Sequence, residues 1–255
     1  MTKTELAHWD RPHWEAGGGT PTLFYKLHGE FSEAPAVSRS KYRCEGPPPG
    51  LDLTVVTEAE DPGSFGFGLD DVFAERLRRD HPTLTEQVEK APHAMIIRGE
   101  IADHGDLNYL RDTVGLIMAM LDAGGLAVFD PFILDWWTPE AWRSEIFDAD
   151  GPVPRHHALI LVSEQEKADR KWIHTRGMRK FGRPDISIRG VEEGEMQAMI
   201  DLCNRFIEMQ AFGAVIADAQ PIRMKSLKGD WACFHGGDLD DPDFNNVHVE
   251  VRRMG

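Results

Sequence analysis

The segment from residue 93 to residue 129 limits the fold of this chain more than any other part of its sequence. Residues 93–100 (His-Ala-Met-Ile-Ile-Arg-Gly-Glu) form a short apolar run typical of a buried strand. Apolar residues then recur at helical spacing until Gly124-Gly125, where glycine suits a helix C-terminal cap. These residues are Leu107, Leu110, Val114, Ile117, Met118 and Leu121. Residues 126–129 resume as a strand, so the segment predicts strand–helix–strand with the apolar positions facing a sheet.

A similar order of elements is expected in the second half of the chain. The expected elements are a strand at residues 157–162, a helix from the capping box Ser163-Glu164-Gln165-Glu166 to Gly182, a strand at residues 185–189, a helix through Met196, Met199, Ile200, Cys203, Phe206 and Ile207, and a strand at residues 214–217. We therefore predict an α+β fold of two strand–helix–strand units, with mixed or antiparallel sheet and helices packed mainly on one side.

The remaining segments suggest how the chain divides into domains. Residues 1–20 carry two His-Trp pairs ahead of Gly17-Gly18-Gly19, which indicates an N-terminal arm, flexible or packed on the body. Residues 21–255 would form the α+β domain, as one body or as two similar halves at about 21–150 and 151–255. Within it we expect strands at residues 23–31, 51–57 and 247–252. A helix over residues 70–89 should be interrupted at His81-Pro82.

A basic run stands out against the charge of the whole protein. Residues 167–189 hold eight Lys and Arg against two Asp, a local balance of 8 − 2 = +6. The full chain carries 28 − 43 = −15, so the rest sums to −21. Such a run meets an anionic ligand or pairs with the protein's own carboxylates, and the sequence leaves both open.

Composition excludes several classes of function. The sequence contains three widely spaced cysteines and no established metal-ligand spacing, so we expect no metal and no cofactor. A pI near 5.1 argues against a nucleic-acid binder. The start shows no secretory signal and no apolar run is long enough to span a bilayer, which favours a cytoplasmic protein without membrane attachment.

The candidate site residues all lie in the basic run. On the expected helix, Arg176, Arg179 and Arg183 fall near helical spacing, with Lys180 alongside, and such guanidiniums can hold a phosphate or carboxylate. His174 is the candidate general base, because its ordinary pKa lies near neutrality. The predicted ligand-binding set is therefore His174, Thr175, Arg176, Arg179, Lys180 and Arg183. The alternative is that these cations pair with acids such as Glu164, Glu166, Glu192 and Glu193.

The same run resembles a stretch found in bacterial proteins grouped as domains of unknown function. The shared pattern is His-Thr-x-Gly-hydrophobe-x-x-Phe-Gly-x-Pro-acid, here from His174 to Asp185 before a strand. The resemblance covers the run and is compatible with residues 158–224. The resemblance implies a fold related to those of these proteins, and it implies no activity.

Three functions follow from these observations as hypotheses. We expect a non-catalytic binding protein whose partner is another protein or a small anion. An alternative is a hydrolase or transferase acting on a phosphorylated or carboxylated metabolite with His174 as base. A third is an immunity-like acidic protein that masks a basic partner through the negative charge outside the run.

Overall fold

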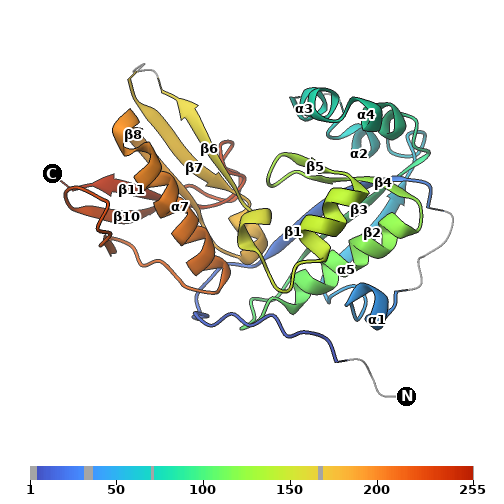
Figure 1. The fold of residues 1–255 in the computed structure, drawn as a ribbon, viewed down its shortest axis with the longest axis horizontal. Helices are drawn as coiled ribbons and strands as arrows, with labels where there is room; N and C mark the ends of the chain where they lie inside the picture. The colour runs from blue at the N-terminus through green and yellow to red at the C-terminus, as the bar shows by residue number, and fades with distance from the viewer. Residues whose placement is uncertain (1–4, 32–36, 70–71, 166–168, 255) are drawn as a thin grey trace. The chain divides into compact units, whose positions relative to one another are not determined.

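Two β-sheets organise the chain, one in each of two units (Figure 1). The computed structural model describes residues 5–31, 37–69, 72–165 and 169–254. Unit 1 comprises Met1–Asp10, Thr22–Ala102 and Asp106–Val153, and unit 2 comprises Arg11–Pro21, Asp103–Gly105 and Pro154–Gly255. Both units combine helices with sheet, one antiparallel and one mixed, so the predicted α+β class is confirmed.

Unit 1 is built on a five-stranded antiparallel sheet in the order β2-β3-β1-β4-β5. Its strands are β1 Thr22–Gly29, β2 Leu51–Val56, β3 His93–Glu100, β4 Gly125–Asp130 and β5 Asp135–Trp137. Its helices are α1 Arg39–Tyr42, α2 Pro62–Gly66, α3 Val72–Asp80, α4 Pro82–Glu89, α5 Asn108–Asp122 and α6 Pro139–Ala141, followed by the π-helical turn η1 Trp142–Phe147.

The strand–helix–strand prediction in unit 1 is confirmed by β3, α5 and β4. Val114 and Ile117 of α5 are buried, as are the other predicted core positions of that helix. On β1, Tyr25 contacts Trp142 whereas His28 contacts Phe65, because successive side chains of a strand point to opposite faces. The helices of unit 1 thus lie on both faces of its sheet, α5 on one and α2 to α4 on the other (Figure 1).

The helix expected over residues 70–89 is confirmed for its described part. Helix α3 ends at Asp80 and α4 begins at Pro82, with His81 between them. The restriction that a proline places on the preceding residue explains this break. Residues 70 and 71 lie outside the described residues.

Unit 2 is built on a six-stranded mixed sheet in the order β6-β7-β8-β11-β10-β9. Its strands are β6 Leu159–Glu164, β7 Lys171–Arg176, β8 Asp185–Val191, β9 Pro221–Ile222, β10 Trp231–Gly236 and β11 His248–Arg253. Its one long described helix is α7 Met196–Ala211, and its 3-10 turns are η2 Pro154–His156, η3 Met178–Phe181 and η4 Glu193–Glu195. Strand β11 is parallel to β8, and the other neighbouring strands are antiparallel.

The core of unit 2 lies between α7 and one face of this sheet. Met199, Cys203 and Phe206 of α7 form a buried cluster with Ile173 and Ile188 of the sheet. The apolar spacing through α7 predicted this helix, and the alternation after Asp185 predicted β8. The opposite face of β7 carries Trp172, His174 and Arg176, so the basic run begins on the sheet face that α7 leaves uncovered.

Two predictions in unit 2 are wrong. The helix expected from Ser163 to Gly182 is replaced by a hairpin of β6 and β7, in which Ser163 lies opposite Trp172. Alternation of inward Ile173 and Thr175 with outward neighbours favours a strand, and Gly177 ends it at a φ of 106°, which a helix does not contain. Glu166 of the capping box lies outside the described residues.

The strand expected at residues 214–217 does not form either. Ile216 is buried in the core of unit 2, but its segment is irregular. The place beside β10 is taken by Pro221 and Ile222 of β9. An apolar run therefore predicted burial correctly here and pairing incorrectly, because burial alone does not select the strand that completes a sheet.

Candidate functional site

His174 lies in an aromatic stack on the outer face of β7. Its ring stacks on Trp172 with centroids 3.8 Å apart and meets the edge of Phe244 at 5.7 Å. Its side chain is buried, and its Nδ1 has no hydrogen-bond partner in the described chain. Burial, followed by the nearby Arg176 charge, lowers the pKa of His174 to about 4. The imidazole is therefore neutral at pH 7 and a weak base, and its contacts favour packing over proton transfer.

An acidic loop between β10 and β11 covers this stack. Phe244 enters the stack from the loop, and its ring also stacks on His248 with centroids 4.5 Å apart. Trp172 is held from the other side, because the Arg189 guanidinium lies 4.0 Å from its ring centroid. The same guanidinium lies 3.7 Å from a carboxylate oxygen of Asp243 in the loop. Aromatic packing and one ion pair thus fasten the loop to the outer face of the sheet.

Two arginines of the basic run bind the backbone of that loop. Arg176 donates to the carbonyl of Asp243, and Arg179 donates to the carbonyl of Asn245 at 2.8 Å. Arg176 projects from β7, whereas Arg179 belongs to the turn η3, so they do not share a helix face. They nevertheless converge on neighbouring carbonyls. The loop carbonyls thus accept the hydrogen bonds that the oxygens of an anionic ligand would otherwise accept.

Thr175 points away from this group, into the interior of unit 2. Its hydroxyl donates to the Asp185 carboxylate at 2.8 Å and accepts from the Ile186 amide at 2.8 Å. Asn246 also donates to the Asp185 carboxylate at 2.8 Å. Burial raises the pKa of Asp185 to about 6 despite these donors. Thr175 thus holds the start of β8 in place and does not face the other candidate residues.

Lys180 and the cations at the outer end of the β6–β7 hairpin also have partners within the protein. The Lys180 side chain is buried, and its Nζ donates to the carbonyl of His157 at 3.1 Å. At the hairpin, Lys171 pairs with Glu164 and Arg170 pairs with Glu192. Glu164 and Glu192 are among the acids that the sequence suggested as internal partners.

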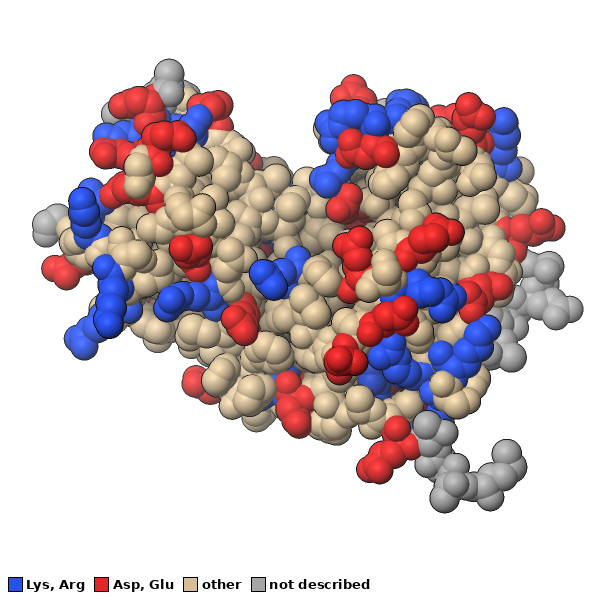
Figure 2. All heavy atoms as spheres, in the orientation of Figure 1, with Lys and Arg blue, Asp and Glu red and all other residues tan. Residues whose placement is uncertain are grey.

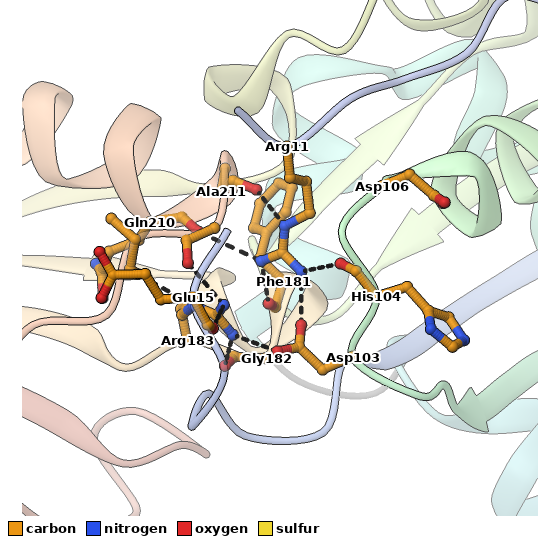
Figure 3. A network of polar contacts seen from close by, with 12 residues as sticks. Arg11, Glu15, Asp103, His104, Asp106, Phe181, Gly182, Arg183, Gln210 and Ala211 are labelled. Atoms are coloured by element: carbon orange, nitrogen blue, oxygen red, sulfur yellow. Dashed lines mark hydrogen bonds and ion pairs between the residues drawn. The ribbon is translucent and has the colours of Figure 1, made fainter. Parts of the chain in front are cut away.

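Arg183 belongs to a buried network with two residues from distant parts of the sequence (Figure 3). Asp103 lies between the two guanidiniums: one carboxylate oxygen is 2.6 Å from Arg11 Nη1, and the other is 3.2 Å from Arg183 Nη1. The side chains of Arg11 and Arg183 are 0% and 1% exposed. We call Arg11, Asp103 and Arg183 the arginine clasp.

The arginine clasp also caps the C-terminal end of α7. Arg11 donates to the carbonyls of Gln210 and Ala211, and Arg183 donates to those of Gly213 and Ala214. Gln210 and Ala211 lie in the last turn of α7, at the negative end of the helix dipole, and Gly213 and Ala214 follow the helix directly. No basic residue lies in the last turn of α7, so cations from outside supply that cap. The two guanidiniums thus share one carboxylate and donate to carbonyls at and just after the end of one helix.

The middle glycine of the run of three in the arm is explained by the same network. A Cβ built on Gly18 would lie 1.7 Å from Arg183 Nη1, so any larger residue there would force the buried guanidinium out of its hydrogen bonds. The Gly19 amide donates to the carbonyl of Gly182 at 2.9 Å. The segment Arg11–Pro21 is therefore bound to unit 2 by its backbone as well as by Arg11.

The structure therefore divides the predicted site residues into two groups. His174, Arg176 and Arg179 gather beneath the acidic loop, whereas the other three take part in separate interior contacts. Those three are Thr175, Lys180 and Arg183. Sequence reasoning missed Arg11 and Asp103, since neither lies in a motif and each is far along the chain from Arg183.

The described residues offer little for covalent or metal chemistry. The three cysteines are free and buried, and burial raises the pKa of Cys44 and Cys233 to about 11 and that of Cys203 to about 12. Within the described ranges, no group of three or more His, Cys, Asp or Glu is placed to hold a metal ion. No helix in the same ranges is long and apolar enough to cross a bilayer.

The comparisons with known proteins add no relative. A scan against protein-family models, a search of curated proteins and a search of solved structures each found no match. The resemblance to the bacterial domains of unknown function therefore stays a prediction from the residues of the basic run.

Proposed function

We propose that the protein acts by binding another protein, through pairing of an extended segment of the partner with strand β6. This strand ends the sheet of unit 2, and among the described strands it pairs only with β7. An edge strand presents a row of backbone N–H and C=O groups that can pair with a further strand. Its first four residues, Leu159 to Val162, are all aliphatic. This long, aliphatic edge strand, with β7 as its one partner among the described strands, is the observation that carries the proposal.

The two edges of this sheet differ in how they are protected. Strand β9 at the far edge is two residues long and begins with Pro221, and both features block further pairing. Strand β6 is six residues long and contains neither proline nor lysine. Its register with β7 is unbroken from Leu159 to Glu164, so no bulge turns the edge away. The Val162 side chain is 44% exposed.

The charge of the chain indicates the chemistry of the partner. A net charge of −15 favours approach of a segment rich in Lys and Arg. On the face drawn in Figure 2, Asp and Glu are interspersed with Lys and Arg, so the negative charge is not gathered into one patch there. We therefore assign affinity to strand pairing and apolar contacts along β6, with charge directing the approach.

The test is selection of binding peptides from a displayed random library by the full chain, followed by calorimetry with wild type and two variants. Lysine in the middle of an edge strand opposes pairing, so Val162→Lys should weaken binding by about tenfold or more. Val55→Lys is the matched control, because Val55 is also 44% exposed and lies on β2, the long edge strand of unit 1. It should bind like wild type.

Two results would count against this function. One is equal binding of the selected peptides to the wild type and to Val162→Lys. The other is selection of peptides that lack alternating apolar and basic residues. Circular dichroism and thermal melting of both variants show whether the fold is kept, which separates lost pairing from lost structure.

A further inference from the structure

A cavity beside α7 is lined by cations that the fold itself does not use. Its volume is about 810 Å³. The helix contributes Asp201, Asn204 and Arg205, and the segment between β9 and β10 contributes residues 223–226. The residues of that segment that line the cavity are Arg223, Met224, Lys225 and Ser226. We call this cavity the α7 groove.

Arg205, Arg223 and Lys225 differ from the cations of the basic run in their partners. Within the described chain, none of the three makes an ion pair, a side-chain hydrogen bond or a ring contact. By contrast, Arg176, Arg179 and Arg183 donate to carbonyls or carboxylates of the protein. An acidic protein that pairs most of its cations internally thus leaves three around one groove.

The charge of the α7 groove is positive. Its lining carries three cations and one carboxylate, a balance of 3 − 1 = +2 in a chain of net charge −15. The carboxylate, Asp201, accepts a hydrogen bond from Gln197 at 2.9 Å. Since exposed charges interact over about 8 Å at physiological ionic strength, the local balance governs what enters the groove.

We infer that the α7 groove binds the phosphate group of a small soluble molecule. Guanidinium groups such as Arg205 and Arg223 match the oxygens of a phosphate in geometry, and Lys225 adds a third positive charge. Ser226 and Asn204 are neutral side chains able to donate further hydrogen bonds.

The size and the apolar part of the groove indicate an organic phosphate. Met224 is half-buried in the lining and offers an apolar contact beside the cations. The volume falls in the range of roughly 300–1,000 Å³ that small-molecule sites occupy. The ligand class is therefore a phosphate ester whose organic part rests on Met224. This site is separate from strand β6, so neither proposal depends on the other.

The experiment is isothermal titration of the full chain with pyrophosphate and with phenyl phosphate at low ionic strength. Wild type should bind both probes. Arg223→Glu should weaken binding by about tenfold or more, because a phosphate contact is replaced by repulsion. Arg223 is exposed, so the variant should melt like wild type. Arg205→Gln gives a second, milder test from the helix side.

A matched control separates the α7 groove from general charge effects. Lys90→Glu changes the net charge by the same amount at an exposed lysine of unit 1 that makes no described ion pair, and it should bind like wild type. The Met224→Ser variant should lose affinity for phenyl phosphate but not for pyrophosphate. Vesicles containing phosphatidic acid should not retain the protein, which distinguishes a soluble ester from a lipid headgroup.

The inference would be overturned by any of three results. These are absence of pyrophosphate binding by wild type, equal binding by Arg223→Glu, and equal losses in Arg223→Glu and Lys90→Glu. Retention on phosphatidic acid vesicles with no binding of phenyl phosphate would also overturn the assignment of a soluble ligand.

Discussion

Replacing Asp103 with Asn tests the arginine clasp. The substitution keeps the size of the side chain but removes the carboxylate that contacts the guanidiniums of both Arg11 and Arg183. Asn can still accept a hydrogen bond from one of them, but its amide would point a donor at the other. Both buried guanidiniums then lose the negative charge of Asp103.

The expected loss follows from the two contacts that Asp103 makes. Each is a charge-assisted hydrogen bond, worth about 1.5–3 kcal/mol. Breaking a buried pair by removing one partner costs about 3–5 kcal/mol, which agrees with that sum. Because the remaining donors of Arg11 and Arg183 still reach carbonyls, we expect the lower part of this range, about 3 kcal/mol.

Urea unfolding followed by tryptophan fluorescence measures this loss. With a slope of about 2 kcal/mol/M, the midpoint should fall by about 1.5 M. Asp10→Asn is the control: Asp10 is exposed and pairs only with His8 in the described chain, so the change should stay below about 0.5 kcal/mol. A midpoint for Asp103→Asn equal to that of Asp10→Asn would refute the structural role of the clasp.

Three further substitutions test other parts of the account. Val114→Asp places a carboxylate in the core around α5 and should lower the free energy of unfolding by roughly 3 kcal/mol or more, and an unchanged melting temperature would contradict the packing of this helix. Gly18→Ala should lower the free energy of unfolding by about 1–3 kcal/mol, because its Cβ would overlap Arg183. Gly194→Ala is the control in the same unfolding assay: its Cβ would meet no atom within 4 Å, so the free energy of unfolding should change little. The folded-state pKa of His174 is about 4, below its ordinary value, so acidification from pH 6.5 to 4 favours the unfolded chain, which takes up the proton. His174→Phe should therefore lose less stability over that window, by up to about 1.4 kcal/mol per pH unit, and parallel pH curves for the two proteins would contradict the assignment.

The sequence predicted the parts of the fold that depend on local spacing. The apolar positions of α5 and α7, the break at His81-Pro82 and the alternation after Asp185 all signal their structure within a few residues. The prediction of a helix over residues 163–182 was wrong because a capping-box pattern was given more weight than the alternation from Lys171 to Arg176. Pairing with a neighbouring strand decides whether such a segment forms a strand or a helix, and that pairing cannot be read from the local sequence.

The partners of the basic run depend on contacts that local sequence does not show. Arg183 is held by Asp103 and by the end of α7, and Arg176 by the carbonyl of Asp243. Nothing in the spacing of these arginines distinguishes them from Arg223, which has no described partner. Whether a cation is used by the fold or left for a ligand becomes visible only when the tertiary contacts are known.

The claim that the basic run holds the protein's own loop is tested most directly by melting Arg176→Glu with and without pyrophosphate. The new carboxylate would lie near Asp185, Asp241 and Asp243, so the free variant should melt well below wild type. It should still be stabilised by pyrophosphate as much as wild type, because the α7 groove is intact. A variant that melts like wild type and has lost its response to pyrophosphate would contradict the account and place the anion site in the basic run.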